Sequence, residues 1–317
     1  MLDLVRHRGW YYLLSFLVIL PGLISLLIAP ALRPGIEFSS GTTMTLRFAQ
    51  PVGQEDLRAA LGELGHPETR VQRSGDDFLI RTRELKGAEA APPVGPAPAG
   101  EREALEAGLR DRFGDFQALD FSSVSATVSR EIGRNATIAV LAASLGILVY
   151  ITWAFRRLPR PLVYGTGALI AMGHDILVVL GAYSIMGKLL GAEVNTMFIV
   201  GMLTIIGYSV HDTIVVFDRI RENRLRYSAH ELEHVVNISL WETMTRSINT
   251  SMSVVIAIVA LLLLGGPTIR DFLLVLLIGV VSGTYSSIFT ASQFVVSWEK
   301  GDLRRLGRLL PRPLPAR

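Results

Sequence analysis

The chain has 317 residues, half of them hydrophobic, and a formal net charge of only +3. Its apolar residues are gathered into long blocks, which excludes an ordinary soluble globular protein and indicates a polytopic membrane protein. It has no cysteine, which excludes disulfides, thiol chemistry and a cysteine-based metal site. The basic residues concentrate beside the apolar blocks, so they indicate membrane topology and not nucleic-acid binding.

The first apolar block, residues 10–29, follows a short basic leader and opens with three aromatic residues. It is longer than the about 7 to 15 apolar residues of a signal peptide. Since more spans follow, we predict that residues 1–31 form a cytoplasmic N-terminus and an uncleaved first transmembrane helix. The dipeptide Pro21-Gly22 predicts a break midway along this helix.

Residues 32–133 are polar and predict a soluble α+β domain between the first and second spans. Strands are predicted at 43–48, 70–72, 77–82 and 116–124, and helices at 54–64 and 101–112. The order βαββαβ is typical of a ferredoxin-like domain. The Pro-, Ala- and Gly-rich stretch 87–100 predicts an extended loop inserted into it.

Five further spans are predicted within residues 134–298, followed by a basic tail at 299–317. They cover roughly residues 136–155, 162–186, 196–217, 248–264 and 272–296. The Lys and Arg residues of the short connections fall mainly on one side of a six-span path, which predicts cytoplasmic termini and a periplasmic soluble domain. An amphipathic stretch at 229–242 predicts a separate helix on the cytoplasmic surface.

The fourth span carries an acidic residue deep in the membrane. Between residues 196 and 217, His211 and Asp212 are the only Asp, Glu, Lys, Arg or His. At 1.5 Å per residue, Asp212 lies about 24 Å below the outer end of the span. An aspartate at that depth is costly and usually marks an ion or proton path; the alternative is a neutral side chain in a structural hydrogen bond. His211 points about 100° away and ranks below Asp212.

The fifth span opens with a polar stripe. Arg246 is followed by Asn249, Thr250 and Ser253 at positions i+3, i+4 and i+7. If the fourth and fifth spans are neighbours, Arg246 can extend along its aliphatic stem and pair with Asp212. The alternative for Arg246 is a residue that reaches only to the membrane boundary.

The third span has a second such pair, His174-Asp175. Paired aspartates occur in intramembrane proteases, but neither aspartate here has a Gly-x-Gly-Asp context. No metalloprotease, nucleotide-binding or serine-nucleophile motif is present either, so we predict no enzyme and no metal site. Close helix contacts are predicted at Gly279-x-x-x-Gly283. The sixth span also carries polar residues that would line a wet crevice: Ser282, Thr284, Ser286, Ser287, Thr290, Ser292 and Gln293.

Residues 205–223, with Tyr208-Ser209-Val210-His211-Asp212 at their centre, closely resemble the signature of the SecF family. Residues 246–251 resemble the fifth-helix motif of that family. Residues 35–42 resemble its Gly-Ile-Asp-Phe-x-Gly-Gly-Thr element, which places Gly35, Glu37, Phe38 and Gly41 at the outer mouth. Two positions differ: Glu37 replaces the usual Asp, and Ser40 replaces a Gly that would adopt positive φ more easily.

This resemblance implies a non-enzymatic, RND-type half with six transmembrane helices and a periplasmic domain, located in the bacterial inner membrane. With SecD, it would use the proton motive force to promote preprotein translocation through the Sec channel and release from it. Proton-coupling roles fall to Asp212 and Arg246, and supporting roles to His211, His174, Asp175, Asn249, Thr250 and Ser253. No cofactor is implied beyond the proton gradient. The implied partners are SecD, SecYEG, YajC or YidC, the unfolded preprotein and membrane lipids.

Two other functions fit the same residues. An assembly scaffold would use the buried charges only to fix helix register, and would tolerate neutral replacements at Asp212 and Arg246. A small-molecule or lipid exporter would need a substrate-sized pocket in or above the bundle. The small size of the soluble domain argues against an autonomous pump.

Overall fold

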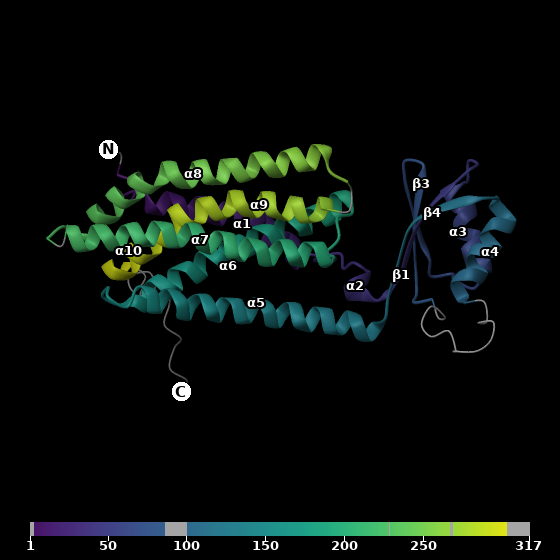
Figure 1. The fold of residues 1–317 in the computed structure, drawn as a ribbon, viewed down its shortest axis with the longest axis horizontal. Coiled ribbons are helices and arrows are strands. Elements are labelled where there is room, and N and C mark those ends of the chain that lie inside the picture. The colour runs from purple at the N-terminus through teal and green to yellow at the C-terminus, as the bar shows by residue number, and fades with distance from the viewer. Residues whose placement is uncertain (1–2, 86–99, 228, 267–268, 303–317) are drawn as a thin grey trace, which may run out of the picture. The chain divides into compact units, whose positions relative to one another are not determined.

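The computed structural model describes residues 3–85, 100–227, 229–266 and 269–302. The chain forms two compact units (Figure 1): an α+β unit, Pro34–Ala136, and a helical unit, Met1–Arg33 with Thr137–Arg317. Most of the predicted 87–100 loop and of the basic tail falls on residues 86–99 and 303–317, outside the described residues.

The α+β unit has the predicted βαββαβ order. It comprises β1 (Gly41–Phe48), α3 (Gln54–Glu63), β2 (Arg70–Ser74), β3 (Asp77–Thr82), α4 (Glu101–Phe113) and β4 (Phe116–Val124). The strands pair in the order β2-β3-β1-β4, and each neighbouring pair is antiparallel. This is the ferredoxin-like arrangement, so the predicted fold class of the domain is confirmed.

The core of this unit follows from strand alternation. Met44 and Leu46 of β1 point to the same face as Phe48, where leucines of α3 and α4 cover them. Figure 1 shows both helices on one side of the sheet. Between the two central strands, β1 and β3, the Arg47 guanidinium donates to both oxygens of Asp77 at 2.6 and 2.9 Å, and this hydrogen bonding lowers the pKa of the Asp77 carboxyl.

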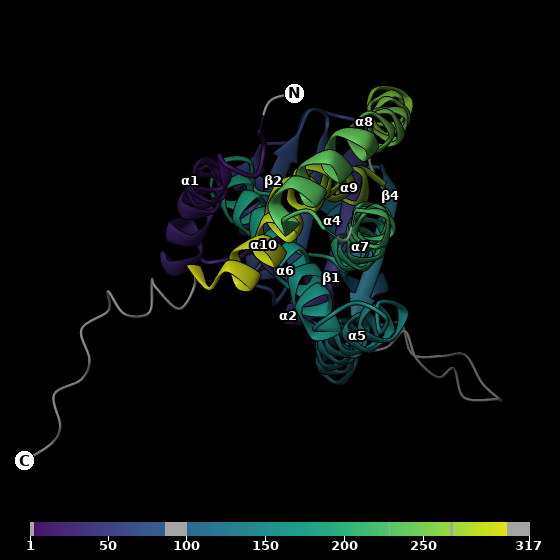
Figure 2. The ribbon, with the colours of Figure 1, turned by 90° about the vertical axis from the view of Figure 1, so that its left-hand side faces the viewer.

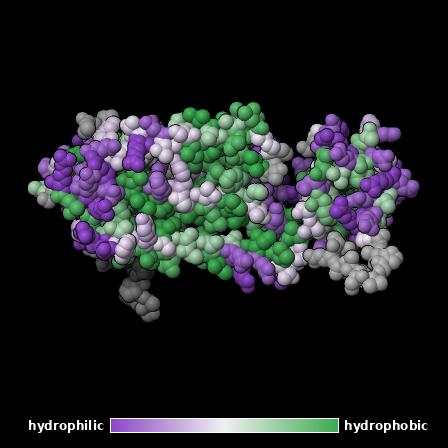
Figure 3. Space-filling view, in the orientation of Figure 1, coloured by the Kyte–Doolittle hydropathy of each residue, from purple (hydrophilic) through white to green (hydrophobic). Residues whose placement is uncertain are grey.

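Among its described residues, the helical unit has six helices that are long and apolar enough to span a membrane, as predicted. They are α1 (Arg8–Leu27), α5 (Ala126–Ala154, which begins in the α+β unit), α6 (Pro161–Leu190), α7 (Thr196–Arg226), α8 (Leu232–Leu264) and a last span of α9 (Arg270–Ser286), a π-helical turn (Ser287–Ala291) and α10 (Ser292–Lys300). α6, α7 and α9 form the buried centre, and α1, α5 and α8 lie around it (Figure 2). Hydrophobic side chains cover the middle of the unit (Figure 3).

Two details of the predicted helices are wrong. The stretch 229–242 does not form a separate surface helix, because residues from Leu232 onward are the first turns of α8. Its apolar face, including Val236 and Leu240, packs into the bundle core and not onto a membrane surface. The expected break at Pro21-Gly22 is also absent, since α1 continues through both residues. Membrane helices tolerate proline where neighbouring groups compensate for the lost backbone bond.

Gly22 has a packing role where α1 crosses α6. A Cβ atom on Gly22 would lie 2.6 Å from the Cα of Gly181, and the reverse holds for a Cβ on Gly181. The two backbones are therefore in direct contact, a close approach that small residues permit in membrane bundles.

We expect Gly22→Ala to destabilise the helical unit by about 1–3 kcal/mol, because the added methyl group must push α1 away from α6. The measurement is the temperature at which the detergent-solubilised chain loses its monodisperse size-exclusion peak after heating. Gly146→Ala in α5 is the matched control, since a Cβ there meets nothing within 4 Å. Equal melting temperatures for the two variants would contradict this packing.

The junction between α2 (Ile36–Ser39) and β1 contains a strained residue. Ser40 has φ +59° and ψ +165°, and Gly41 follows with φ +124°. The Ser40 conformation is one that glycine adopts far more easily than serine does, at a cost of about 1–3 kcal/mol for other residues. The Ser40 amide donates a hydrogen bond to the Ser129 hydroxyl at 3.1 Å. The same hydroxyl donates a hydrogen bond to the Ile36 carbonyl at 3.2 Å.

Ser40→Gly should stabilise the α+β unit by about 1 kcal/mol, since relief of strain exceeds the added entropy of the unfolded chain. Hydrogen-exchange mass spectrometry of β1 and β3 peptides in the full chain should show exchange slowed by about fivefold. Gly41→Ala should speed exchange instead, because its Cβ would lie 2.6 Å from the Thr82 carbonyl oxygen. Unchanged or faster exchange in Ser40→Gly would show that the backbone is not strained.

Candidate functional site

Asp175 of α6 is buried where α6, α7 and α9 meet. Ser282 donates to its Oδ1 at 2.6 Å, and Ser209 and Ser286 donate to its Oδ2 at 2.6 and 2.7 Å. The Nδ1 atom of His174 lies 3.1 Å from Oδ1. Hydrogen bonds this short are typical of bonds to carboxylate oxygens. Asp175 therefore ties three helices together through side chains that satisfy both of its oxygens.

Asp212 of α7 is equally buried, with 2% of its surface exposed, but it is far less well satisfied. Its nearest hydrogen-bond donor is the Ser251 hydroxyl at 3.4 Å, and the Nδ1 atom of His211 lies 3.9 Å away. Ser251 itself is shared, because Thr284 donates to it at 2.6 Å and the Tyr208 hydroxyl lies at 3.0 Å. A buried carboxyl group with one long hydrogen bond is costly, so a proton or an added partner would stabilise it.

The predicted ion pair between Arg246 and Asp212 is not formed. α7 and α8 are neighbours, but α8 presents Ser251 to Asp212, while Arg246 is exposed on another face of the helix. Within the described ranges, Arg246 makes no ion pair. The rest of the predicted stripe is exposed as well: Asn249, Thr250 and Ser253. The Thr250 and Ser253 hydroxyls donate to the carbonyls of Arg246 and Asn249, at 2.9 and 2.8 Å.

Three of the polar residues predicted to line a wet crevice in the last span are hydrogen-bonded inside the bundle. Ser282 and Ser286 bind Asp175, and the Ser287 hydroxyl lies 2.9 Å from that of Thr213. These three side chains are buried and connect neighbouring helices. A sequence signal for this role existed, because Ser282 and Ser286 are four residues apart and so share one helix face.

The residues predicted at the outer mouth lie together in the α+β unit. Gly35 precedes α2, Glu37 and Phe38 form it, and Gly41 opens β1. The Gly35 carbonyl accepts a hydrogen bond from the Phe38 amide at 3.1 Å, and this bond closes the short turn of α2. Glu37 contributes its backbone to the single helical turn of α2.

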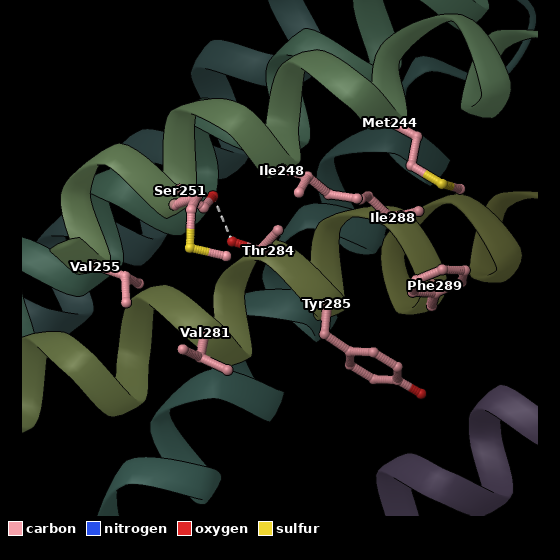
Figure 4. A pocket seen from close by; sticks show the side chains of 10 residues that line it. Met244, Ile248, Ser251, Val255, Val281, Thr284, Tyr285, Ile288 and Phe289 are labelled. Carbon is pink, nitrogen blue, oxygen red and sulfur yellow. Dashed lines mark hydrogen bonds between the residues drawn. The ribbon is translucent and has the colours of Figure 1, made fainter.

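A groove of about 320 Å³ adjoins the hydroxyl network of Asp212 between α8 and α9 (Figure 4). Ser251 and Thr284, joined by their hydrogen bond, are its polar members. Its other lining residues are Met244, Ile248, Met252, Val255, Val281, Tyr285, Ile288 and Phe289. Ile248, Met252 and Val281 are roughly half-exposed, so the groove opens on the outer side of these helices. Its mainly apolar lining does not suit a polar substrate.

Fold and site together define a polytopic membrane protein with ionisable groups inside its helix bundle and a ferredoxin-like domain inserted after its first span. In this class, buried carboxyl groups typically mark ion or proton paths. Comparisons with known proteins then identify the family.

The family model described as "Protein export membrane protein SecD/SecF, C-terminal" matches residues 104–301, and the "SecD/SecF GG Motif" matches residues 25–52. The chain is 48% identical to the protein translocase subunit SecF of Thermobaculum terrenum, over 97% of each chain. It is 37% identical to the SecF subunit of Anaerolinea thermophila, over 96% of each chain. The chain belongs to the SecF family of protein translocase subunits, which confirms the resemblance drawn from its motifs.

The similar solved structures are longer proteins. The crystal structure of SecDF from Thermus thermophilus matches with a TM-score of 0.77 and 32% identity, over 94% of this chain and 39% of that chain. The SecDF protein of Bacillus subtilis, 32% identical, is likewise covered over 39% of its length. This chain thus corresponds to less than half of those SecDF proteins.

Asp175→Asn should destabilise the helical unit by about 1–3 kcal/mol, because an amide group replaces one oxygen that accepts short hydroxyl bonds. Asp212→Asn, the matched control, should change stability little, since Asp212 has a single long bond to lose. Both variants are compared by heating the purified full chain in detergent and measuring the remaining monodisperse fraction. The opposite order of stabilities would refute the structural role of Asp175.

Proposed function

We propose that this chain couples the proton motive force to protein export, acting in a complex with SecD. Its family gives the coarser role, that of a protein translocase subunit. The observation that carries the finer proposal is the poor satisfaction of Asp212, buried in a membrane helix with one hydroxyl at 3.4 Å. A group so placed can gain or lose a proton with little rearrangement, and each state favours different neighbours.

SecD is the proposed partner at the exposed polar stripe of α8. Some relatives are named SecDF, and this chain matches 39% of their length. Arg246 is exposed on a membrane-spanning helix, where an unpaired charge costs several kcal/mol. A second helical bundle with an acidic residue facing Arg246 would remove that cost. The same contact would cover Asn249, Thr250 and Ser253.

In the proposed cycle, Asp212 alternates between two arrangements. When protonated, it is held as in this structure, beside the Ser251 hydroxyl. When charged, it attracts Arg246, which lies five residues before Ser251 on α8 and hence about 140° around the helix. A rotation or shift of α8 would exchange the two partners. Such a shift would couple proton movement to a change in helix packing. The free energy of proton movement is about 2.3 kcal/mol per charge per 100 mV.

The proposed location is the bacterial inner membrane, with both termini in the cytoplasm and the α+β unit in the periplasm. The asymmetric distribution of Lys and Arg supports this orientation. Further proposed partners are SecYEG, YajC or YidC, and the unfolded preprotein. The proton gradient is the proposed energy source in place of a cofactor.

The alternative function, a scaffold that uses a buried charge to fix helix register, is supported at Asp175 and not at Asp212. Asp175 has strong partners on three helices, which is the arrangement expected of a group that fixes helix register. We therefore assign helix assembly to Asp175 and proton coupling to Asp212.

Asp212→Asn should abolish the part of preprotein export that depends on the proton gradient, because an amide cannot alternate between charged and protonated states. Export into inverted vesicles is measured with and without a gradient, in the presence of SecD, together with co-purification of SecD. Asp218→Asn is the matched control: it removes the same charge from α7 at an exposed position. A normal gradient response in Asp212→Asn, with SecD still bound, would leave only a structural role for this residue.

A further inference from the structure

Four hydroxyl residues of α8 follow one another at intervals of four: Ser239, Thr243, Ser247 and Ser251. All four are buried, with exposed fractions of 0 to 6%. Between residues 241 and 257, Thr243, Ser247 and Ser251 are the only buried residues of α8. Residues four apart share one side of a helix, so the four hydroxyls form a row about 18 Å long. We call this set the hydroxyl row.

One end of the hydroxyl row meets a carboxyl group directly, and the other end lies one amide group away from a second carboxyl group. At one end, Ser251 contacts Asp212. At the other end, Ser239 accepts a hydrogen bond from Asn223 at 3.0 Å, and the same Asn223 amide donates to Glu242 at 2.6 Å. About a third of the Glu242 side chain is exposed, so it is accessible to solvent. The Asn223 amide thus separates Ser239 from Glu242, which is also paired with Arg219 at 2.7 Å.

Ser247, in the middle of the row, differs from its neighbours. The Ser239 and Thr243 hydroxyls donate to the carbonyls four residues earlier, at 2.7 and 2.8 Å, as helical serines and threonines commonly do. The buried Oγ of Ser247 has no hydrogen-bond partner among the described residues. Such a group costs about 1–3 kcal/mol, and in native proteins ordered water usually satisfies it.

The spacing of the row suits bridging water. Positions four apart on a helix are separated by about 6 Å along its axis, which equals two hydrogen bonds of about 2.8 Å. One water between Thr243 and Ser247, and another between Ser247 and Ser251, would give the Ser247 hydroxyl both a donor and an acceptor. A second buried group is also unsatisfied: both side-chain amide atoms of Gln293, in α10, lack a partner in the described part of the chain, and α10 contacts α8.

We propose that Ser247 is a water-binding site and that Ser251, Ser247 and Thr243, with bridging waters, form a proton relay that leads away from Asp212. This inference rests on the proposed proton-coupling role of Asp212. When Asp212 releases its proton to Ser251, the Ser251 hydroxyl passes its own proton to the next water, and the exchange repeats along the row. Only O–H bonds form and break. Every relay oxygen ends with its original number of protons, and the released proton passes from the Thr243 hydroxyl to solvent water.

Silver-ion accessibility tests the water site directly, because the chain contains no cysteine. Ser247→Cys is introduced into the full chain and exposed to Ag⁺, which is small enough to follow water, in chloride-free buffer. Val179→Cys is the matched control, fully buried in an apolar cluster of α6. We expect Ser247→Cys to react at least about tenfold faster, because a thiol surrounded by apolar groups ionises and reacts poorly. Equally slow reaction at both positions would overturn the water site.

The relay itself is tested by gradient-dependent export in vesicles with SecD. Ser247→Ala removes the relay oxygen and should lower the gradient-dependent rate by about tenfold or more, whereas Ser247→Thr keeps the hydroxyl and should retain most of it. Equal rates in the two variants would overturn the relay. The outcomes remain separable from the proposed function: if Asp212→Asn keeps its gradient response, proton coupling fails, while the silver reaction still decides whether Ser247 meets water.

Discussion

The cost of burying a carboxyl group in a membrane bundle governs this structure, and the chain meets that cost in two ways. Asp175 is surrounded by short hydroxyl bonds from two other helices, which fixes α6, α7 and α9 against one another. Asp212 lies on the same central helix as one of those donors, Ser209, yet has only a distant hydroxyl. The bundle thus holds one carboxyl group rigidly and leaves the other poorly satisfied. This difference is the basis for proposing a structural role for Asp175 and a role in proton movement for Asp212.

Local patterns were enough to predict the elements of the fold. Six apolar blocks predicted the spans, and strand alternation with intervening helices predicted the ferredoxin-like order, because these signals depend on neighbours along the chain. Contacts between distant segments left no such signal. Gly22 and Gly181 touch although their positions in the sequence are far apart, and the continuity of α8 through 232–264 depends on a bundle core that covers its first turns.

The site was predicted less completely, and α8 shows why. This helix carries two polar rows: one contains Arg246 and Thr250, and the other contains Ser247 and Ser251. Both have helical spacing, so periodicity cannot decide which one faces the interior. The charged row was predicted to face Asp212, but the uncharged row does so. Small hydroxyl residues fit between closely packed helices, whereas an arginine needs either more space or a partner that this chain does not supply.

The outward position of Arg246 bears on how the proposed machine is regulated. Among the described residues of this chain, Asp212 has no Lys or Arg partner and only His211 at 3.9 Å, and the exposed Arg246 has no acidic partner. If SecD supplies an acidic group beside Arg246, its binding sets the position of α8 and therefore the distance from Arg246 to Asp212. Proton uptake and release would then become productive only after assembly. On the proposed cycle, a subunit without its partner would not dissipate the gradient, because Arg246 would not be positioned to pair with the charged Asp212.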